Sequence, residues 1–345
     1  MNENKKITIF SNAPVTLRIT ALWAFSEAFL GGILHGLKVP FAGLFLALIA
    51  ALCMTIIASA TVKKGELIKA TLLVLAVKFL LSPHTPLPAY LAVFIQGLVG
   101  ELLFLNRKML KPSAFLLSVF CLTYSAFQHL LVLTILFGNE WWKAVDIFLN
   151  KITKSFVNGT YQYSYYIIII YFSCYFLAGI VGGILNLKII QKIKKGGDPD
   201  LFKIWNEQYS IAGGFDSTAS KSPKKKRRFL VIIGVLAFMI MVISYLPFFK
   251  AGFSKNSITE LVLRAIVILI VWNLFLTPLL RKGIKKWFDK YQQKNKSSLQ
   301  QIVALLPEIR RILQASWKFS DHSNKWIRVK NFISISVLLI AGNEQ

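Results

Sequence analysis

Charge-poor apolar runs, separated by short polar segments, recur along most of the 345-residue chain. A run of about 20 apolar residues crosses a bilayer as a helix. The third run is short and carries Lys69 and Lys78, and the fourth begins at Pro86 and Pro88. We therefore predict an all-α, polytopic integral membrane protein with about eight transmembrane helices: Leu17–His35, Phe41–Val62, Leu67–Leu81, Leu87–Leu105, Ser113–Phe137, Tyr163–Leu187, Phe229–Phe249 and Leu261–Leu280.

The composition supports this prediction, because 55% of residues are hydrophobic, 16% are charged and the mean hydropathy is +0.57. A soluble domain has about 25% charged residues. A soluble enzyme, a disulfide-rich secreted domain and a disordered tail are thereby excluded. The three cysteines, Cys53, Cys121 and Cys174, lie inside apolar runs without metal-ligand spacing and are interpreted as small buried hydrophobes.

The net charge of +26 comes from 41 Lys and Arg against 15 Asp and Glu. Positive residues accumulate in loops on the inner side of a membrane. If the N-terminus is inside, most basic residues fall in inner segments, with the densest group between Lys188 and Arg228. We therefore expect an inner (plasma) membrane protein with both termini cytoplasmic, in contact with membrane lipids, and we attribute the charge to topology and not to nucleic acid.

The chain divides into four parts. Residues 1–190 form a six-helix membrane domain, 191–228 a basic cytoplasmic linker, 229–282 a transmembrane helical hairpin, and 283–345 a basic cytoplasmic tail. In the tail, apolar residues from Ile302 to Trp317 recur at helical spacing. This pattern predicts an amphipathic helix that lies on the inner leaflet or docks a partner. Pro307 is expected to end one helix and begin a second.

The first apolar run contains small residues spaced four apart, Ala24, Ala28, Gly32 and Gly36. Such a stripe lets another helix approach closely. Ala24, Ala28 and Gly32 are therefore candidate partner-docking residues; packing inside the protein's own bundle is the alternative. Gly179 in the sixth run begins a weaker repeat of the spacing.

Ionisable residues inside a membrane are costly and usually functional. Glu27 and Lys78 lie at matching depths in the first and third runs, so we consider an ion pair between them. The alternative is that Lys78 extends to the interface while Glu27 is protonated or faces a cavity.

Three histidines share the outer side. His35 ends the first run, His84 lies in the outer turn between the third and fourth runs, and His129 lies in the outer half of the fifth run. Together with Lys78 and Gln96 they are candidates for an outward-opening pocket, because imidazoles and amides can hydrogen-bond a heterocycle. The candidate ligand-binding residues are Lys78, His84, Gln96 and His129. Histidines without a specific role remain the alternative.

No metal site, cofactor or catalytic residue is predicted. The histidines lack the spacing of a zinc motif, and no nucleotide-binding loop is present. The tyrosines between Tyr161 and Tyr175, with Trp141 and Trp142 before them, suit an aromatic belt at the outer interface or a wall that stacks on a bound ring.

Residues 1–190 resemble the substrate-binding S component of energy-coupling-factor transporters. The resemblance lies in a six-helix hydrophobic unit of this size and an AxxxA pattern in its first helix, here Ala24 to Ala28. It implies that Ala24 and Ala28 dock onto a membrane coupling subunit and that a vitamin-like molecule binds near the outer surface. The C-terminal hairpin and tail extend beyond an S component.

Our first functional hypothesis is uptake of a small organic molecule from the outer side, energised by separate coupling and ATPase subunits, with no chemistry performed by this chain. The second is a membrane scaffold whose basic cytoplasmic tail recruits a partner. The third is a membrane-embedded enzyme that uses Glu27 and the histidines.

Overall fold

The computed structural model of the chain describes residues 13–36, 41–82, 85, 87–153, 161–194, 270, 278, 295–320 and 324–341. Within these residues the secondary structure is helical, and no strand is present. The elements are α1 (Val15–Phe25), the π-helical η1 (Ser26–Leu30), α2 (Gly31–Gly36), α3 (Ala42–Ala60), α4 (Glu66–Leu81), α5 (Leu87–Leu103), the 3-10 turn η2 (Arg107–Met109), α6 (Leu110–Thr153), α7 (Tyr163–Lys194), α12 (Lys296–Phe319) and α13 (Lys325–Ala341).

Four described segments are long and apolar enough to cross a membrane: Val15–Leu34, Ala42–Ala60, Leu110–Ile135 and Tyr163–Ile193. The third and fourth predicted spans are also helices, α4 and α5, but they are shorter. The 16 residues of α4 extend about 24 Å at 1.5 Å per residue, less than the roughly 30 Å of a hydrocarbon core. The predicted spans Phe229–Phe249 and Leu261–Leu280 lie outside the described residues, apart from two single positions.

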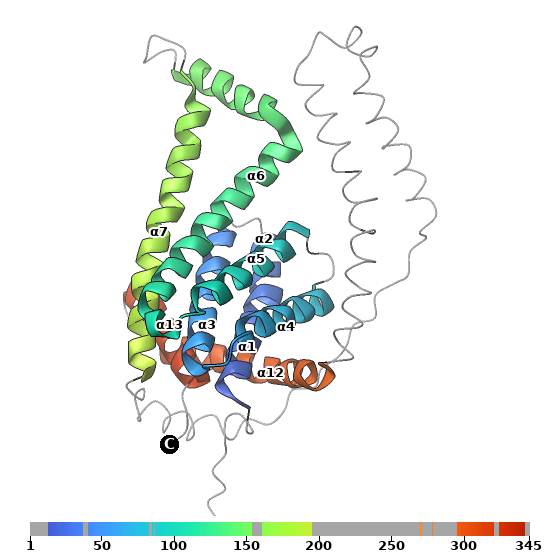
Figure 1. Cartoon of the computed structure of the whole chain (residues 1–345). Helices are drawn as coiled ribbons and strands as arrows, with labels where there is room; N and C mark the ends of the chain where they lie inside the picture. Colours follow the sequence, from blue (N-terminus) through green and yellow to red (C-terminus); the bar gives the residue numbers. More distant parts are fainter. Residues whose placement is uncertain are drawn as a thin grey trace, which may run out of the picture.

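The α6 and α7 helices form a long antiparallel pair that extends beyond the ends of the shorter helices (Figure 1). Between the predicted spans Ser113–Phe137 and Tyr163–Leu187, α6 continues to Thr153 across a kink. The kink is at Gly138, whose φ of 68° is accessible to glycine at little cost. Past the kink, Asp146 accepts hydrogen bonds from the backbone N–H and hydroxyl of Ser164, at 2.6 and 2.8 Å, and so ties this segment to the start of α7.

The close approach of α6 and α7 depends on a small residue. A Cβ added at Gly179 would lie 2.9 Å from the Cα of Val119. A buried polar contact supports the same pair, because the Asn186 Nδ2 donates to the Ser118 Oγ at 2.7 Å. The small-residue spacing in the sixth apolar run therefore serves packing within this chain.

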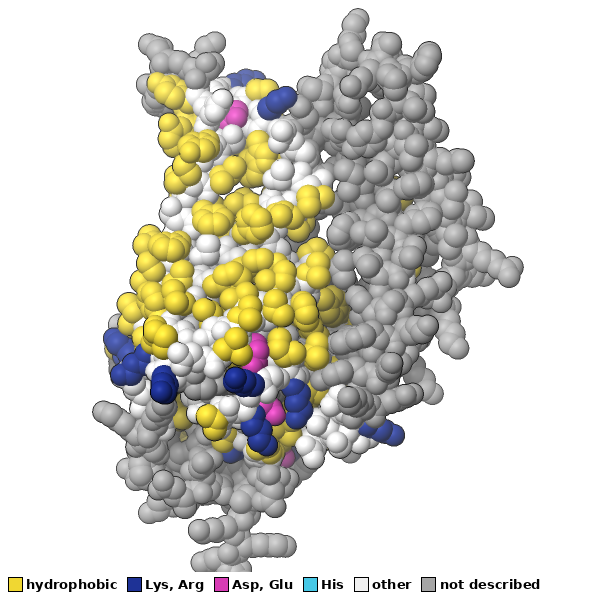
Figure 2. All heavy atoms as spheres, viewed as in Figure 1, with side chains coloured by type: hydrophobic (Ala, Val, Ile, Leu, Met, Phe, Trp, Pro, Cys, Tyr) yellow, Lys and Arg dark blue, Asp and Glu magenta, His cyan; other side chains and the backbone are white. Residues whose placement is uncertain are grey.

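Hydrophobic side chains cover the middle of one face of the molecule, and Lys and Arg side chains gather toward its lower end (Figure 2). Large apolar residues such as Phe127, Ile170 and Leu177 are exposed on α6 and α7. Exposed apolar surface of this extent is expected where lipid surrounds a helix. The described residues thus form a helical body whose apolar surface and four long apolar helices suit a membrane.

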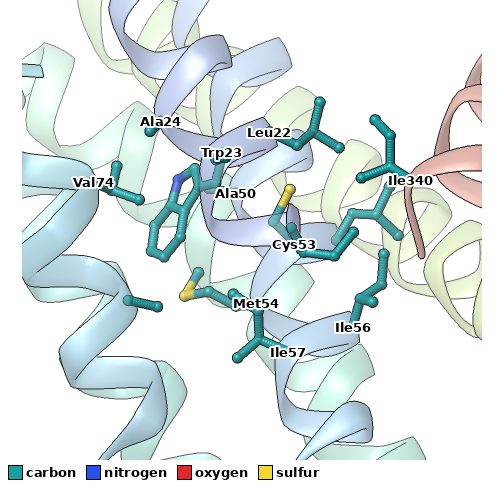
Figure 3. Packing of buried hydrophobic residues seen from close by; sticks show 14 of the residues in the cluster. Leu22, Trp23, Ala24, Ala50, Cys53, Met54, Ile56, Ile57, Val74 and Ile340 are labelled. Carbon is teal, nitrogen blue, oxygen red and sulfur yellow. The ribbon is translucent and has the colours of Figure 1, made fainter. Parts of the chain in front are cut away.

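The core lies where α1, α3 and α4 meet. Trp23 of α1 is fully buried between Val74 of α4 and Ala50 of α3 (Figure 3). On the other side of α1, Ile340 of α13 points toward Leu22 and Cys53 (Figure 3). The α13 helix therefore contributes to the same core as the first helix.

The amphipathic helix predicted in the tail is present as α12, and its apolar face packs on the protein itself. Ile302, Ile309 and Ile312 are buried, and α12 contacts α1, α4 and α13. The α12 and α13 helices lie across the lower end of the N-terminal helices (Figure 1). The predictions of a helix lying on the leaflet or offering its apolar face to a partner are therefore wrong for this face.

The prediction that Pro307 separates two helices is also wrong, because α12 continues through it. Proline removes the hydrogen bond from its own nitrogen to the carbonyl four residues earlier. Here both Pro307 and Val303 lie on the exposed side of α12, where water can hydrogen-bond the unpaired carbonyl. Burial of the opposite face offsets the remaining cost.

Candidate functional site

A cavity of about 660 Å³ lies between the ends of the N-terminal helices and the α6–α7 pair. This volume is typical of sites for small organic molecules. By the topology expected from the sequence, these helix ends lie on the outer side. The described residues that line the cavity are Glu27, Leu34, Phe41, Ala42, Gly43, Leu46, Ala47, Lys78, Pro88, Ala89, Ala92, Val93, Gln96, Ser125, Gln128, His129, Val132, Tyr171 and Tyr175.

A buried ion pair forms one wall of the cavity. The Lys78 Nζ lies 2.7 Å from the Glu27 Oε2, and the two residues are only 4% and 5% exposed. The Lys78 ammonium also lies 5.8 Å from the centre of the Tyr90 ring, a cation–π distance. The ion pair considered from matching depths is therefore present, and Lys78 does not extend to the interface.

The backbone at Glu27 departs from a regular α-helix. Residues Ser26–Leu30 form a π-helical turn between α1 and α2, and the Ser26 hydroxyl donates to the Trp23 carbonyl at 2.8 Å. A π-turn rotates the side chains that follow relative to an α-helix, and such turns are frequent at functional sites. Glu27 lies within this turn, lines the cavity and contacts Lys78 of α4.

Two glutamines add amide groups to the cavity. Gln96 is buried on α5, and its Nε2 lies 3.5 Å from the Cys121 carbonyl, at the outer limit of a hydrogen bond. The Gln128 Nε2 donates to the Pro88 carbonyl at 2.6 Å, which joins α6 to the start of α5. These bonds orient both amides, each of which carries a carbonyl oxygen as an acceptor.

Aromatic rings form the opposite wall. Tyr171 and Tyr175 of α7 have ring centres 4.8 Å apart, and the Tyr171 hydroxyl donates to the Tyr175 hydroxyl at 3.1 Å. Phe41 lies 6.4 and 6.1 Å from these two rings, and His129 lies 5.9 Å from Tyr171. Aromatic groups at such distances form a surface on which a planar ring can stack.

The structure brings together three of the four predicted ligand-binding residues, since Lys78, Gln96 and His129 all line the cavity. His84 lies outside the described residues, and only the backbone of His35 is described. Among the described residues, no group of three His, Cys, Asp or Glu side chains is arranged to hold a metal ion.

The small-residue stripe in the first helix is not an open docking surface. Ala24 is fully buried and Ala28 is 7% exposed, both inside this chain's own bundle. Gly32 is exposed, and a Cβ added there would meet no atom within 4 Å. The partner-docking prediction is therefore wrong for Ala24 and Ala28, because α3 and α4 cover this part of α1.

The sequence prediction missed several lining residues. Phe41, Ser125 and Gln128 were not candidates, although Gln128 is adjacent to His129 and Phe41 begins a predicted span. Glu101 was also missed as a structural residue. Its carboxylate accepts hydrogen bonds from the backbone N–H groups of Gly65 and Leu67, at 2.7 and 3.1 Å, and so caps the N-terminus of α4.

Comparison with known proteins gives no match: no protein-family model, no curated protein and no solved structure is significantly similar to this chain.

Proposed function

We propose that this protein binds a small organic molecule in the cavity beside Glu27 and Lys78 and takes part in its uptake across the plasma membrane. The observation that carries the proposal is a 660 Å³ cavity, bounded by a buried ion pair and an aromatic wall, in a membrane-embedded helical body. Buried charges inside a membrane are costly, and a ligand site is a common reason for their presence. The protein would act as the binding component, similar to an S component, with no chemical step of its own.

Uptake against a concentration gradient requires a source of energy, which we assign to separate coupling and ATPase subunits. Ala24 and Ala28 are buried, so a coupling subunit would contact another surface of the bundle. The basic residues near the ends of α3 and α7, such as Lys64 and Lys188, support a cytoplasmic location for these ends and for both termini.

A scaffold role for the tail is the second candidate. Exposed basic residues of α12 and α13, including Arg310, Lys318 and Lys330, support it. Because the apolar face of α12 packs on α1, a partner would meet only this charged face. Surface ion pairs contribute little each, so the cavity is the better-supported site.

Native mass spectrometry of the purified protein tests the proposal. The wild-type protein is expected to carry a small molecule that is released on activation. Ala92→Trp fills part of the cavity and should abolish this bound mass. Leu98→Trp, on the exposed face of the same helix, is the matched control and should retain it. Equal occupancy in both variants would place the molecule elsewhere and contradict the proposal.

A further inference from the structure

We propose that the ligand of this cavity is an uncharged, planar, ring-containing molecule, and that the Glu27–Lys78 pair sets this preference. The inference rests on the proposed function and specifies the class of molecule bound. Its basis is the charge balance of the cavity wall together with the positions of the amides and the aromatic rings.

The two opposite charges in the cavity wall balance each other. Glu27 and Lys78 are one anion and one cation in contact at 2.7 Å, so their charges compensate each other. Apart from this pair and His129, the lining side chains that the structure describes are uncharged. An anionic ligand would have to compete with Glu27 for Lys78, and a cationic one would have to compete with Lys78 for Glu27. Either exchange leaves a buried charge without its partner, which is strongly unfavourable.

The cavity wall also combines aromatic rings with amide groups. The rings of Phe41, Tyr171 and Tyr175 offer a surface for a flat molecule. Gln96 and Gln128 supply oriented amides along the cavity. An uncharged ring with amide-like or hydroxyl substituents matches these groups without disturbing the ion pair.

Three probes of the same shape test the inference: benzamide, benzoate and benzylamine, which are neutral, anionic and cationic. Binding is measured on the full-length protein in lipid nanodiscs at about pH 8, where a carboxylic acid is ionised and an alkylamine is protonated. Wild-type protein should bind benzamide at least about tenfold more tightly than either ion. This comparison needs no variant, so it does not depend on whether a substitution is tolerated.

Two variants then shift the preference in opposite directions. Glu27→Gln leaves Lys78 without its counter-charge and should favour benzoate, whereas Lys78→Met should favour benzylamine. The double variant Glu27→Gln/Lys78→Met is again neutral and should return to benzamide.

The outcomes separate the two proposals. Tighter binding of benzoate or benzylamine than of benzamide to wild-type protein overturns the inference of an uncharged ligand and leaves the proposed function standing. A folded Glu27→Gln or Lys78→Met that keeps the wild-type order overturns the role of the pair. If none of the three probes binds to any of the four proteins, the proposed binding function fails and the inference fails with it.

Discussion

The Glu27–Lys78 pair is a costly feature for a membrane protein. Both side chains are removed from water, and their attraction in a low-dielectric environment repays the loss of hydration only while both charges are present. The contact is held by two elements, the π-turn of the first helix and α4, so it also joins segments 51 residues apart in the sequence.

Removing one member of the pair should therefore destabilise the protein. Lys78→Met and Glu27→Gln are each expected to lower the free energy of unfolding by about 3–5 kcal/mol. The double variant should recover much of this loss, because no unpaired charge remains. Thermal unfolding in detergent compares the stability of the wild-type protein, the two single variants and the double variant. Additive losses in the double variant would show that the two side chains act independently.

The cap on α4 predicts a smaller effect. Glu101→Ala removes a carboxylate that accepts two backbone N–H groups and should cost about 1–2 kcal/mol. The control Lys69→Ala breaks only a 3.9 Å surface contact with Glu66 and should change stability by less than about 0.5 kcal/mol. Chemical denaturation of the two variants checks the difference, and similar losses in both would argue against the cap.

The sequence predicted a side-chain contact correctly where the depth of each residue along its helix determined that contact. Glu27 and Lys78 could be paired because each lies a similar distance from the inner end of its run. The role of Glu101 could not be found in this way, since its partners are backbone N–H groups 34 and 36 residues away. Such contacts depend on how helices are placed in space.

Among the described elements, α6 and α7 make the most extensive contact. Gly179 permits this approach, and an added methyl group would meet the backbone of Val119 at 2.9 Å. Gly179→Ala should therefore destabilise the protein by about 1–3 kcal/mol, because backbone must shift to admit it. Gly32→Ala is the control: its added Cβ meets open space, so stability should be unchanged or slightly higher. Unfolding measurements that rank the two variants in the reverse order would contradict this packing.

The stability that α12 contributes is expected to depend on pH. Partial burial raises the pKa of the Glu308 carboxyl, and the nearby Arg311 opposes this shift. An acid with a raised pKa contributes its stability at low pH and loses it as the pH rises through the raised value. Glu308→Gln should therefore be more stable than wild type at about pH 8, and the difference should shrink toward the ordinary glutamate value of 4.5. Thermal unfolding at several pH values checks this, and a difference independent of pH would exclude the carboxyl as its cause.

Hydrophobic runs in the sequence predicted the membrane-domain helices of residues 1–190 well. All six predicted spans of residues 1–190 are helical, because a long apolar run in a membrane satisfies its backbone only as a helix. Which helix faces cover one another could not be predicted. The stripe at Ala24 and Ala28 has the same spacing whether it meets another protein or, as here, this chain's own bundle.

What covers the apolar face of the tail helix could not be predicted either. Amphipathic spacing predicted α12, but spacing alone does not identify what covers an apolar face. In the structure the first helix is enclosed by α3, α4, α12 and α13, so the two ends of the described chain stabilise each other. The cavity lies at the opposite end of this enclosed helix, beyond the π-turn.

The proposed uptake depends most on the cavity being open to the outer side of the membrane. Ala92→Cys places a thiol in the cavity lining, in a background where the exposed Cys174 is replaced by serine and the buried Cys53 and Cys121 are retained. Reaction with a small membrane-impermeant methanethiosulfonate is then measured in intact cells and in inside-out vesicles. Rapid modification is expected in intact cells and little in inside-out vesicles; modification only in the vesicles would contradict an outward-facing site.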